Sequence, residues 1–218
     1  KHTNLVSKNF GSWLFLGIIL TELELKNNNL KKNNCGSCEA CIKICPTKAI
    51  ISPFKLDARK CISYLTIEHK SNIEEKYRKL IGNRIFGCDD CLSVCPWNKF
   101  AKKYSENKFE FIKDLDLPKL KKLASFTEKD YRNYFAGTGL RRLGYNRFLR
   151  NLLIAVGNSK DISMLKFVNK NLDNKQEIVR CMAVWALKML DKKIFFLEKD
   201  RRYNLEESFS IKEEWDSI

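Results

Sequence analysis

Two short stretches of the sequence concentrate cysteines at spacings that suit metal binding. The first, CGSCEACIKICP at residues 35–46, packs four cysteines into eleven residues and closes on a proline. The second, CDDCLSVCP at residues 88–96, repeats this pattern without its first cysteine, because Ile85 stands in that position. Thiolates two residues apart can hold one metal centre but pair poorly in disulfides. The spacing therefore predicts metal-bound thiolates and a reducing compartment.

The first stretch matches the C-x2-C-x2-C-x3-C-P run of bacterial ferredoxins, in which the fourth cysteine of each run binds the other cluster. Three closely spaced thiolates wrap one face of a cubane, and the proline turns the chain so that the next cysteine points to a second cubane. Cys61 is the one further cysteine of this region and can replace the ligand missing at Ile85. The predicted ligands are Cys35, Cys38, Cys41 and Cys95 for a first [4Fe–4S] cluster, and Cys45, Cys61, Cys88 and Cys91 for a second.

Two structural zinc sites would also use eight cysteines, but zinc sites seldom carry this run twice. The pattern therefore favours two iron–sulfur clusters. Such a pair can be structural, can form a simple electron carrier, or can deliver electrons to another cofactor. The long insertion at residues 62–87 indicates a docking surface for what receives the electrons.

The charge of the chain favours an anionic partner. Its 218 residues hold 41 Lys and Arg against 26 Asp and Glu, a formal net charge of +15. Guanidinium groups suit phosphates, and an aromatic ring such as Tyr145 can stack on a base. A solvated helix face is the alternative interpretation of the same pattern. The predicted RNA-binding residues, within GLRRLGYNRFLRN, are Arg141, Arg142, Arg147 and Arg150.

Composition divides the chain into three predicted domains, at residues 1–30, 31–104 and 105–218. The first contains the apolar run WLFLGIIL at residues 13–20, which is too short to span a bilayer and is expected to form a buried strand or helix. The second contains eight of the nine cysteines, and the third has the periodicity of helices. The predicted fold class is α+β, with a two-[4Fe–4S] ferredoxin-like domain followed by a HEAT-like helical domain.

Three amphipathic helices are expected in the third domain. NRFLRNLLIAVGN forms the first and is expected to end at Gly157 as a C-cap. DISMLKFVNKNL forms the second, with Asp161 or Ser163 as its N-cap, and KQEIVRCMAVWALKML forms the third. Cys181 lies in the apolar run of the third helix and is expected to be a buried small residue rather than a ligand. The alternation of helices and short polar turns is typical of a HEAT-type solenoid.

Several phrases together resemble the epoxyqueuosine reductase family, from residue 1 to about residue 190. They are KHTNLVSKNFGSWLFLG, LDARKCISYLTIEHK, IGNRIFGCDDCLSVCPWNKFA and FLRNLLIAVGNSKD. The resemblance implies reduction of epoxyqueuosine to queuosine at the tRNA wobble position, the last step of queuosine synthesis. It implies two [4Fe–4S] clusters, cobalamin, an electron donor such as a flavodoxin or ferredoxin, and a tail that holds the anticodon stem-loop. A cytoplasmic monomer with no membrane segment is expected.

In the family, most of the cobalamin pocket and the acidic proton donor precede the stretch that begins at Lys1. The resemblance therefore implies no catalytic residue in this chain, makes residues 1–30 a remnant of the cobalamin-binding domain, and predicts that the chain is inactive by itself. Ile18 stands where the family usually has glutamate. For Asp89, a turn or cap residue is the alternative interpretation. The residues that the resemblance directs toward cobalamin are Ser12, Thr21, Ser63, Cys88 and Asp89.

Three other functions are compatible with parts of the sequence. A stand-alone ferredoxin-like electron carrier fits the cysteines but gives no role to the helical tail or the charge. A relative of reductive dehalogenases would also join two clusters to cobalamin, but the HEAT-like tail disfavours it. An inactive RNA-binding remnant would keep the tail and the charge without the chemistry. Neither His2 nor His69 has a metal-ligand spacing, and neither is assigned to cobalt.

Overall fold

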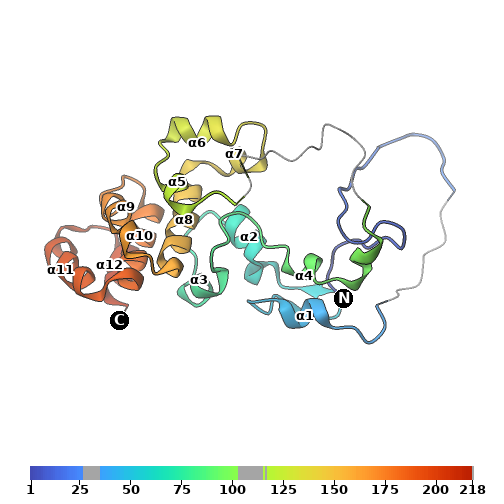
Figure 1. Ribbon diagram of the computed structural model, residues 1–218, viewed down its shortest axis with the longest axis horizontal. Coiled ribbons are helices and arrows are strands. Elements are labelled where there is room, and N and C mark those ends of the chain that lie inside the picture. The colour runs from blue at the N-terminus through green and yellow to red at the C-terminus, as the bar shows by residue number, and fades with distance from the viewer. Residues whose placement is uncertain (27–34, 103–114, 116, 218) are drawn as a thin grey trace. The chain divides into compact units, whose positions relative to one another are not determined.

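The computed structural model describes residues 1–26, 35–102, 115 and 117–217. It divides into two compact units (Figure 1). The cysteine-rich unit comprises the described parts of residues 1–61 and 89–102, and the helical unit comprises residues 62–88, 115 and 117–217. Helices dominate, and one short sheet accompanies them, which agrees with the predicted α+β class.

The cysteine-rich unit is built from very short elements joined by turns. Helix α1 packs against α4 and against the first strand of an antiparallel pair. In that pair Ile50 lies opposite Leu56, and Phe54 makes the turn with a left-handed φ of 63°. The elements are α1 (Ala40–Ile44), β1 (Ile50–Ser52), β2 (Lys55–Leu56), η1 (Ala58–Lys60), α4 (Asp90–Ser93) and η2 (Pro96–Phe100).

The N-terminal segment is tied to η2 by a close backbone approach. Gly11 has a φ of 75°, and a Cβ added there would lie 3.0 Å from the carbonyl oxygen of Trp97. Ser12, next along the chain, is buried, and its hydroxyl donates to Asn98 Oδ1 at 2.6 Å. A glycine is therefore required at position 11 both for its backbone conformation and for the space it leaves.

The apolar run at residues 13–20 does not form the buried strand or helix expected from its hydropathy. It has neither helical nor strand structure, and Ile18, Ile19 and Leu20 are at least 90% exposed. The prediction is wrong for the described residues because hydropathy measures a preference for burial, while burial also needs a covering surface.

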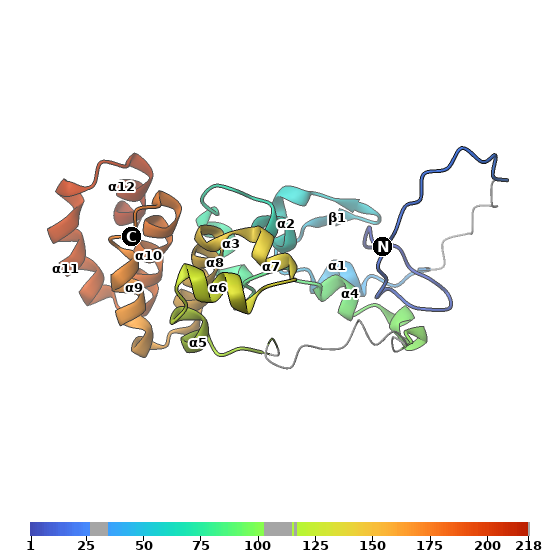
Figure 2. The same cartoon turned by 90° about the horizontal axis from the view of Figure 1, so that it is seen from above.

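The helical unit is organised around α8 and α10, which pack along each other. In Figures 1 and 2, α9, α11 and α12 gather around α10, while α5, α6 and α7 lie around α8. The elements are α2 (Ile62–Ile67), α3 (Glu75–Ile81), α5 (Leu120–Ala124), α6 (Glu128–Tyr134), α7 (Gly139–Leu143), α8 (Tyr145–Ser159), η5 (Ile162–Met164), α9 (Leu165–Asn171), α10 (Glu177–Leu190), α11 (Lys192–Arg202), η6 (Tyr203–Leu205) and α12 (Phe209–Asp216).

The three expected amphipathic helices are present, with one correction. Gly157 does not cap the first of them, because α8 runs on to Ser159 and the left-handed Lys160 follows it. A Cβ at Gly157 would lie 2.6 Å from Cζ3 of Trp185, so this glycine lets α8 and α10 approach closely. The second expected helix begins with η5, and Asp161 is its N-cap, because the Asp161 carboxylate accepts from the Ser163 backbone N–H. This confirms Asp161, one of the two residues predicted to cap that helix.

Cys181 is 2% exposed in α10, as predicted for a packing residue. Burial raises the pKa of its thiol to about 12, and the nearby Glu214 carboxylate adds to the effect. Arg78 of α3 and Glu214 of α12 form a buried ion pair at 2.6 Å beside this thiol. A long-range pair of this kind ties the segment at residues 62–88 to the end of the chain.

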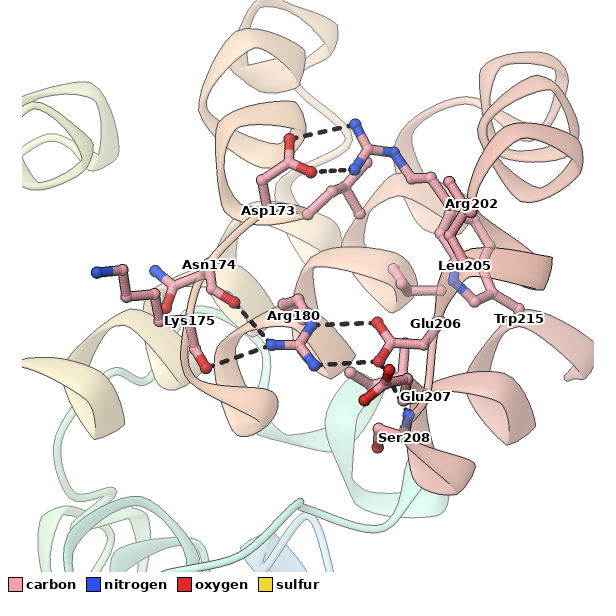
Figure 3. Close-up of a pocket in the computed structure, with 13 residues that line it drawn as sticks. Asp173, Asn174, Lys175, Arg180, Arg202, Leu205, Glu206, Glu207, Ser208 and Trp215 are labelled. Atoms are coloured by element: carbon pink, nitrogen blue, oxygen red, sulfur yellow. Dashed lines mark hydrogen bonds and ion pairs between the residues drawn. The ribbon is translucent and has the colours of Figure 1, made fainter.

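A groove of about 660 Å³ lies among α9, α10 and the η6–α12 region (Figure 3). Figure 3 shows Arg180 paired with Glu206 and Arg202 paired with Asp173 across it. Arg180 also donates to the carbonyl oxygen of Asn174 at 2.9 Å. These arginines are thus engaged by groups of the groove itself, so the pairs brace the C-terminal helices.

The structure groups residues differently from the predicted domains. The predicted boundaries at 30/31 and 104/105 fall outside the described residues. Residues 62–88, placed by composition with the cysteine motifs, belong to the helical unit instead. Among the described residues, no helix combines the length and apolar character needed to cross a bilayer.

Candidate metal centre

One enclosed cavity of about 160 Å³ brings together the four cysteines predicted for the first cluster. Its lining joins thiols from both cysteine motifs, which are more than 50 residues apart in the chain. None of the nine cysteines forms a disulfide bond. The lining residues are Lys1, His2, Cys35, Cys38, Cys41, Cys95, Pro96 and Trp97.

Local structure explains how these thiols converge. Cys38 follows a turn in which its backbone N–H donates to the Cys35 carbonyl at 3.1 Å. Cys41 lies in α1 and is 6% exposed. Cys95 is the N-cap of η2, and Pro96 begins that helix. The proline that follows the last cysteine of the second motif thus turns the chain at the cavity, and four soft sulfur donors around one apolar cavity suit an iron–sulfur cluster.

Zinc and a cubane place different demands on such ligands. Zinc needs its sulfur ligands at about 2.3 Å from one point. The four thiolates of a cubane bind four separate irons and stand farther apart. Among the described residues, no three His, Cys, Asp or Glu side chains converge on a single point in the way that one ion needs.

Several sulfurs receive hydrogen bonds from nitrogen donors. The backbone nitrogen of Lys1 lies 3.2 Å from Cys35 Sγ, and the backbone N–H of Ala49 donates to Cys45 Sγ at 3.3 Å. Asn4 Nδ2 lies 3.9 Å from Cys91 Sγ. Donors of this kind orient ligand thiolates and stabilise their negative charge. The hydrogen bonds reach Cys35 of the first predicted ligand set, and Cys45 and Cys91 of the second.

The second predicted set is half-buried throughout. Cys88 ends the segment grouped with the helical unit, whereas Cys45, Cys61 and Cys91 belong to the cysteine-rich unit. The partition of these four ligands therefore stays a prediction.

Two of the residues directed toward cobalamin have local partners. The Ser12 hydroxyl is buried and bonded to Asn98, and it also lies 3.3 Å from the Leu92 carbonyl oxygen. This structural role corrects the cobalamin assignment of Ser12, because its hydroxyl is already used within the cysteine-rich unit. Thr21 is exposed, and its hydroxyl oxygen accepts from the Leu23 backbone N–H at 3.1 Å.

Of the other three, Cys88 is half-buried in the segment described above, and Ser63 and Asp89 lie at element starts. Ser63 is half-buried in the first turn of α2. Asp89 is exposed, has a left-handed φ of 59°, and precedes α4 without a side-chain capping bond. Asp89 is thus a turn residue by its backbone, while its carboxylate does not serve as the cap of α4.

The structure overturns the RNA-binding prediction for Arg150. Its side chain is fully buried, and burial lowers the pKa of its guanidinium to about 10. It donates to the carbonyl oxygens of Leu65 at 2.8 Å, His69 at 2.7 Å and Ser71 at 2.8 Å. A phosphate cannot reach a guanidinium enclosed in this way.

Arg147 also has backbone partners, so its guanidinium is partly engaged within the helical unit. It is half-buried and donates to the carbonyl oxygens of Leu143 and Ile67, both at 2.8 Å. Asn151, which sequence analysis did not single out, donates to the carbonyl oxygens of Thr66 and Ile85 at 2.8 Å. Together with Arg150 these side chains bind the backbone of residues 62–88 to α8, and this is why the segment joins the helical unit.

The side chains of Arg141 and Arg142 are accessible to an external ligand. Both are exposed in α7, and both line an open pocket of about 560 Å³ with the turn at residues 137–139. His2 is a further residue that sequence analysis did not assign. Nothing in its spacing shows that it would line the cysteine cavity, because the cysteines there are 33 or more positions away.

Comparison with known proteins identifies the family to which this chain is similar. Residues 34–98 match a 4Fe-4S double cluster binding domain. An epoxyqueuosine reductase from Xanthomonas campestris is 45% identical over 190 residues, which is 86% of this chain and 53% of the relative. The Escherichia coli epoxyqueuosine reductase is 43% identical over 159 residues, which is 73% of this chain and 42% of the relative. The chain therefore spans about half the length of these curated relatives.

Solved structures give the same result. A structure of epoxyqueuosine reductase from Bacillus subtilis, with a catalytic loop swung out of its active site, superposes with a TM-score of 0.90 and 27% identity. It covers 98% of this chain and 57% of the relative. An epoxyqueuosine reductase bound to an epoxyqueuosine-modified tRNA stem loop gives the same TM-score, identity and coverage.

Proposed function

The chain belongs to the epoxyqueuosine reductase family, and we propose that it supplies the electron-transfer and tRNA-contacting part of such an enzyme. The observation that carries this proposal is the cavity in which four cysteines from two distant motifs converge. Relatives named for the activity, at 40–45% identity, direct the proposal to the reduction of epoxyqueuosine. The chain spans about half of each of those relatives, so the activity of the whole enzyme is a proposal.

The proposed reaction removes the epoxide oxygen as water, which consumes two electrons and two protons. When bound, the two [4Fe–4S] clusters carry single electrons and cobalamin supplies the cobalt that passes them to the epoxide. The cysteines hold the clusters, and Trp97 and Pro96 limit the access of water to the first cavity. The residues of this chain proposed to face cobalamin are Thr21, Ser63, Cys88 and Asp89.

Arg141 and Arg142 are proposed to contact phosphates of a tRNA anticodon stem-loop. Their exposure and their shared open pocket support this role, and the helical unit is proposed to be HEAT-like. The enzyme is proposed to be a cytoplasmic monomer that accepts electrons from a flavodoxin or ferredoxin. A stand-alone electron carrier is the alternative, and only the absence of tRNA binding would favour it.

Iron content tests the ligand assignment. Anaerobically reconstituted chain should hold close to the eight irons of two [4Fe–4S] clusters. Cys61→Ala should lose the second cluster and keep the first, because no thiol stands at Ile85 to replace it. Cys181→Ala is the matched control and should keep both, since Cys181 is buried in α10. Stoichiometric zinc with little iron would reject the clusters, and a Cys61→Ala protein with both clusters would reject the partition.

Salt dependence tests the RNA contact. In a plot of the logarithm of the tRNA association constant against the logarithm of the salt concentration, the magnitude of the slope should fall by about 0.7–0.9 for each phosphate contact removed. Arg141→Ala with Arg142→Ala should therefore flatten it by between one and two units. Arg201→Ala changes another exposed arginine of the helical unit and should leave the slope unchanged. Equal slopes for the double variant and the wild type would place the RNA site elsewhere.

A further inference from the structure

His2 occupies an unusual position beside the four cysteines. It lines their cavity and is 4% exposed, so its ring is shielded from water. Its Nδ1 accepts a hydrogen bond from the Asn4 backbone N–H at 3.2 Å. That bond fixes the ring, since Nδ1 faces the chain's own backbone and the opposite edge of the ring carries Nε2.

Nε2 of His2 is buried and has no hydrogen-bond partner among the described residues. A neutral imidazole that accepts at Nδ1 carries its proton on Nε2 and is a donor there. Buried donors are nearly always paired, and leaving one unpaired is costly. The cavity wall therefore contains a residue with a buried donor that no described residue satisfies, and a group bound in the cavity can supply its partner.

Lys1 shows that the same segment already donates to the sulfurs. Its backbone nitrogen lies 3.2 Å from Cys35 Sγ, and its carbonyl accepts from the Phe54 backbone N–H at 2.8 Å. The residue before position 2 is thus anchored at both ends of its backbone, to the first cysteine motif and to the turn after β1. His2 is held at the cavity wall by these bonds, and its position does not depend on a flexible tail.

We propose that His2 donates a hydrogen bond from Nε2 to a sulfur of the [4Fe–4S] cluster held by Cys35, Cys38, Cys41 and Cys95, and thereby sets the reduction potential of that cluster. The proposal rests on the proposed function, which places a cluster in the cavity. An electron entering the cluster adds negative charge, and a donor aimed at sulfur stabilises the reduced form more than the oxidised form. His2 therefore raises the potential of this cluster.

An EPR-monitored redox titration of the full reconstituted chain tests the role of His2. His2→Phe keeps a ring of similar size and removes the donor. A hydrogen bond to a charged group is worth about a tenfold change in an equilibrium. The potential of one cluster should therefore fall by about 59 mV, the equivalent of tenfold for a one-electron couple. His2→Gln restores an N–H donor and should stay near the wild-type potential. His69→Phe makes the same change at the other histidine and should alter neither potential.

Nitrogen hyperfine coupling gives a second readout. Protein labelled with ¹⁵N-histidine should show coupling to one reduced cluster, and this coupling should disappear in His2→Phe and persist in His69→Phe. Unchanged potentials in His2→Phe would overturn the proposal. If the His2→Phe protein does not take up this cluster, its potential cannot be compared with the wild type. In that case, the absence of ¹⁵N coupling in the wild-type protein would overturn the proposal. Wild-type chain that takes up no iron would reject the cluster assignment itself, and the role of His2 would fall with it.

Discussion

The cysteine-rich unit and the helical unit are stabilised by different means. Every member of the described hydrophobic core lies in the helical unit, from Ile62 to Trp215. In the described part of the cysteine-rich unit, the buried hydrophobic residues are only Cys41, Ala49 and Ile50. A unit with so little apolar burial cannot offset the entropy of ordering its chain. The helical unit can therefore fold on its own core, whereas the cysteine-rich unit needs its clusters.

Removing iron should produce the largest difference between the units. Chelation under reducing conditions should unfold the cysteine-rich unit, because ligand binding supplies its folding free energy. The helical unit should stay folded. Iodoacetamide at mildly alkaline pH should then label the cysteines of both motifs and leave Cys181 unlabelled, since burial raises the pKa of that thiol to about 12. Peptide mapping by mass spectrometry measures the labelling.

A urea-unfolded sample is the control, in which all nine cysteines should be labelled. Labelling of Cys181 at the same rate as the motif cysteines in the chelated protein would show that the helical unit depends on the clusters too.

Arg150→Met should give the largest loss of stability for a single substitution in the helical unit. It removes a buried guanidinium and leaves the carbonyl oxygens of Leu65, His69 and Ser71 without their donor. The free energy of unfolding should fall by roughly 3–5 kcal/mol, measured by urea denaturation of the helical signal. Arg142→Met is the matched control at an exposed position and should change it by less than about 0.5 kcal/mol. Equal midpoints for the two variants would contradict the structural role of Arg150.

Glu214→Gln should have a smaller effect. It keeps a hydrogen-bond acceptor beside Arg78 and removes the charge from the buried pair, so about 2 kcal/mol of stability should be lost. The double change Arg78→Met with Glu214→Leu should recover most of this loss, because it leaves no buried charge unpaired. A double variant that unfolds as easily as Glu214→Gln would show that packing, not charge, explains the loss.

Ser12→Ala should have the smallest effect and should act on the other unit. Loss of its hydrogen bond to Asn98 should cost about 1 kcal/mol. Iron release to a chelator should then be about fivefold faster, while the urea midpoint of the helical unit stays unchanged. Thr21→Ala, at an exposed position of the same segment, should release iron at the wild-type rate.

The cysteine chemistry was predictable because metal coordination depends on local spacing. The runs that end at Pro46 and Pro96 specify which thiol turns away from its neighbours, and in the structure Cys95 lines one cavity with Cys35, Cys38 and Cys41. The second ligand set follows from the same rule and stays untested.

Tertiary packing limited the other predictions. Arginines at positions 141, 142, 147 and 150 look alike in the sequence, but only the carbonyl oxygens of residues 65–71 decide that Arg147 and Arg150 turn inward. Gly157 resembled a helix end because Trp185, its partner, is far along the chain. The apolar run at residues 13–20 predicted burial, and no local rule says which surface would cover it.

The segments of the two units alternate along the sequence, and this determines the order in which they are synthesised. Residues 62–88 leave the ribosome well before α8, and Arg150 follows His69 by 81 positions. At roughly 5–20 residues per second, the segment waits about 4–16 s for the side chains that bind its carbonyl oxygens. The first cysteine motif, at residues 35–46, has emerged before that interval, and the second, at residues 88–96, emerges within it. A nascent chain can thus present its complete ligand set for cluster insertion while the helical unit is still unfinished.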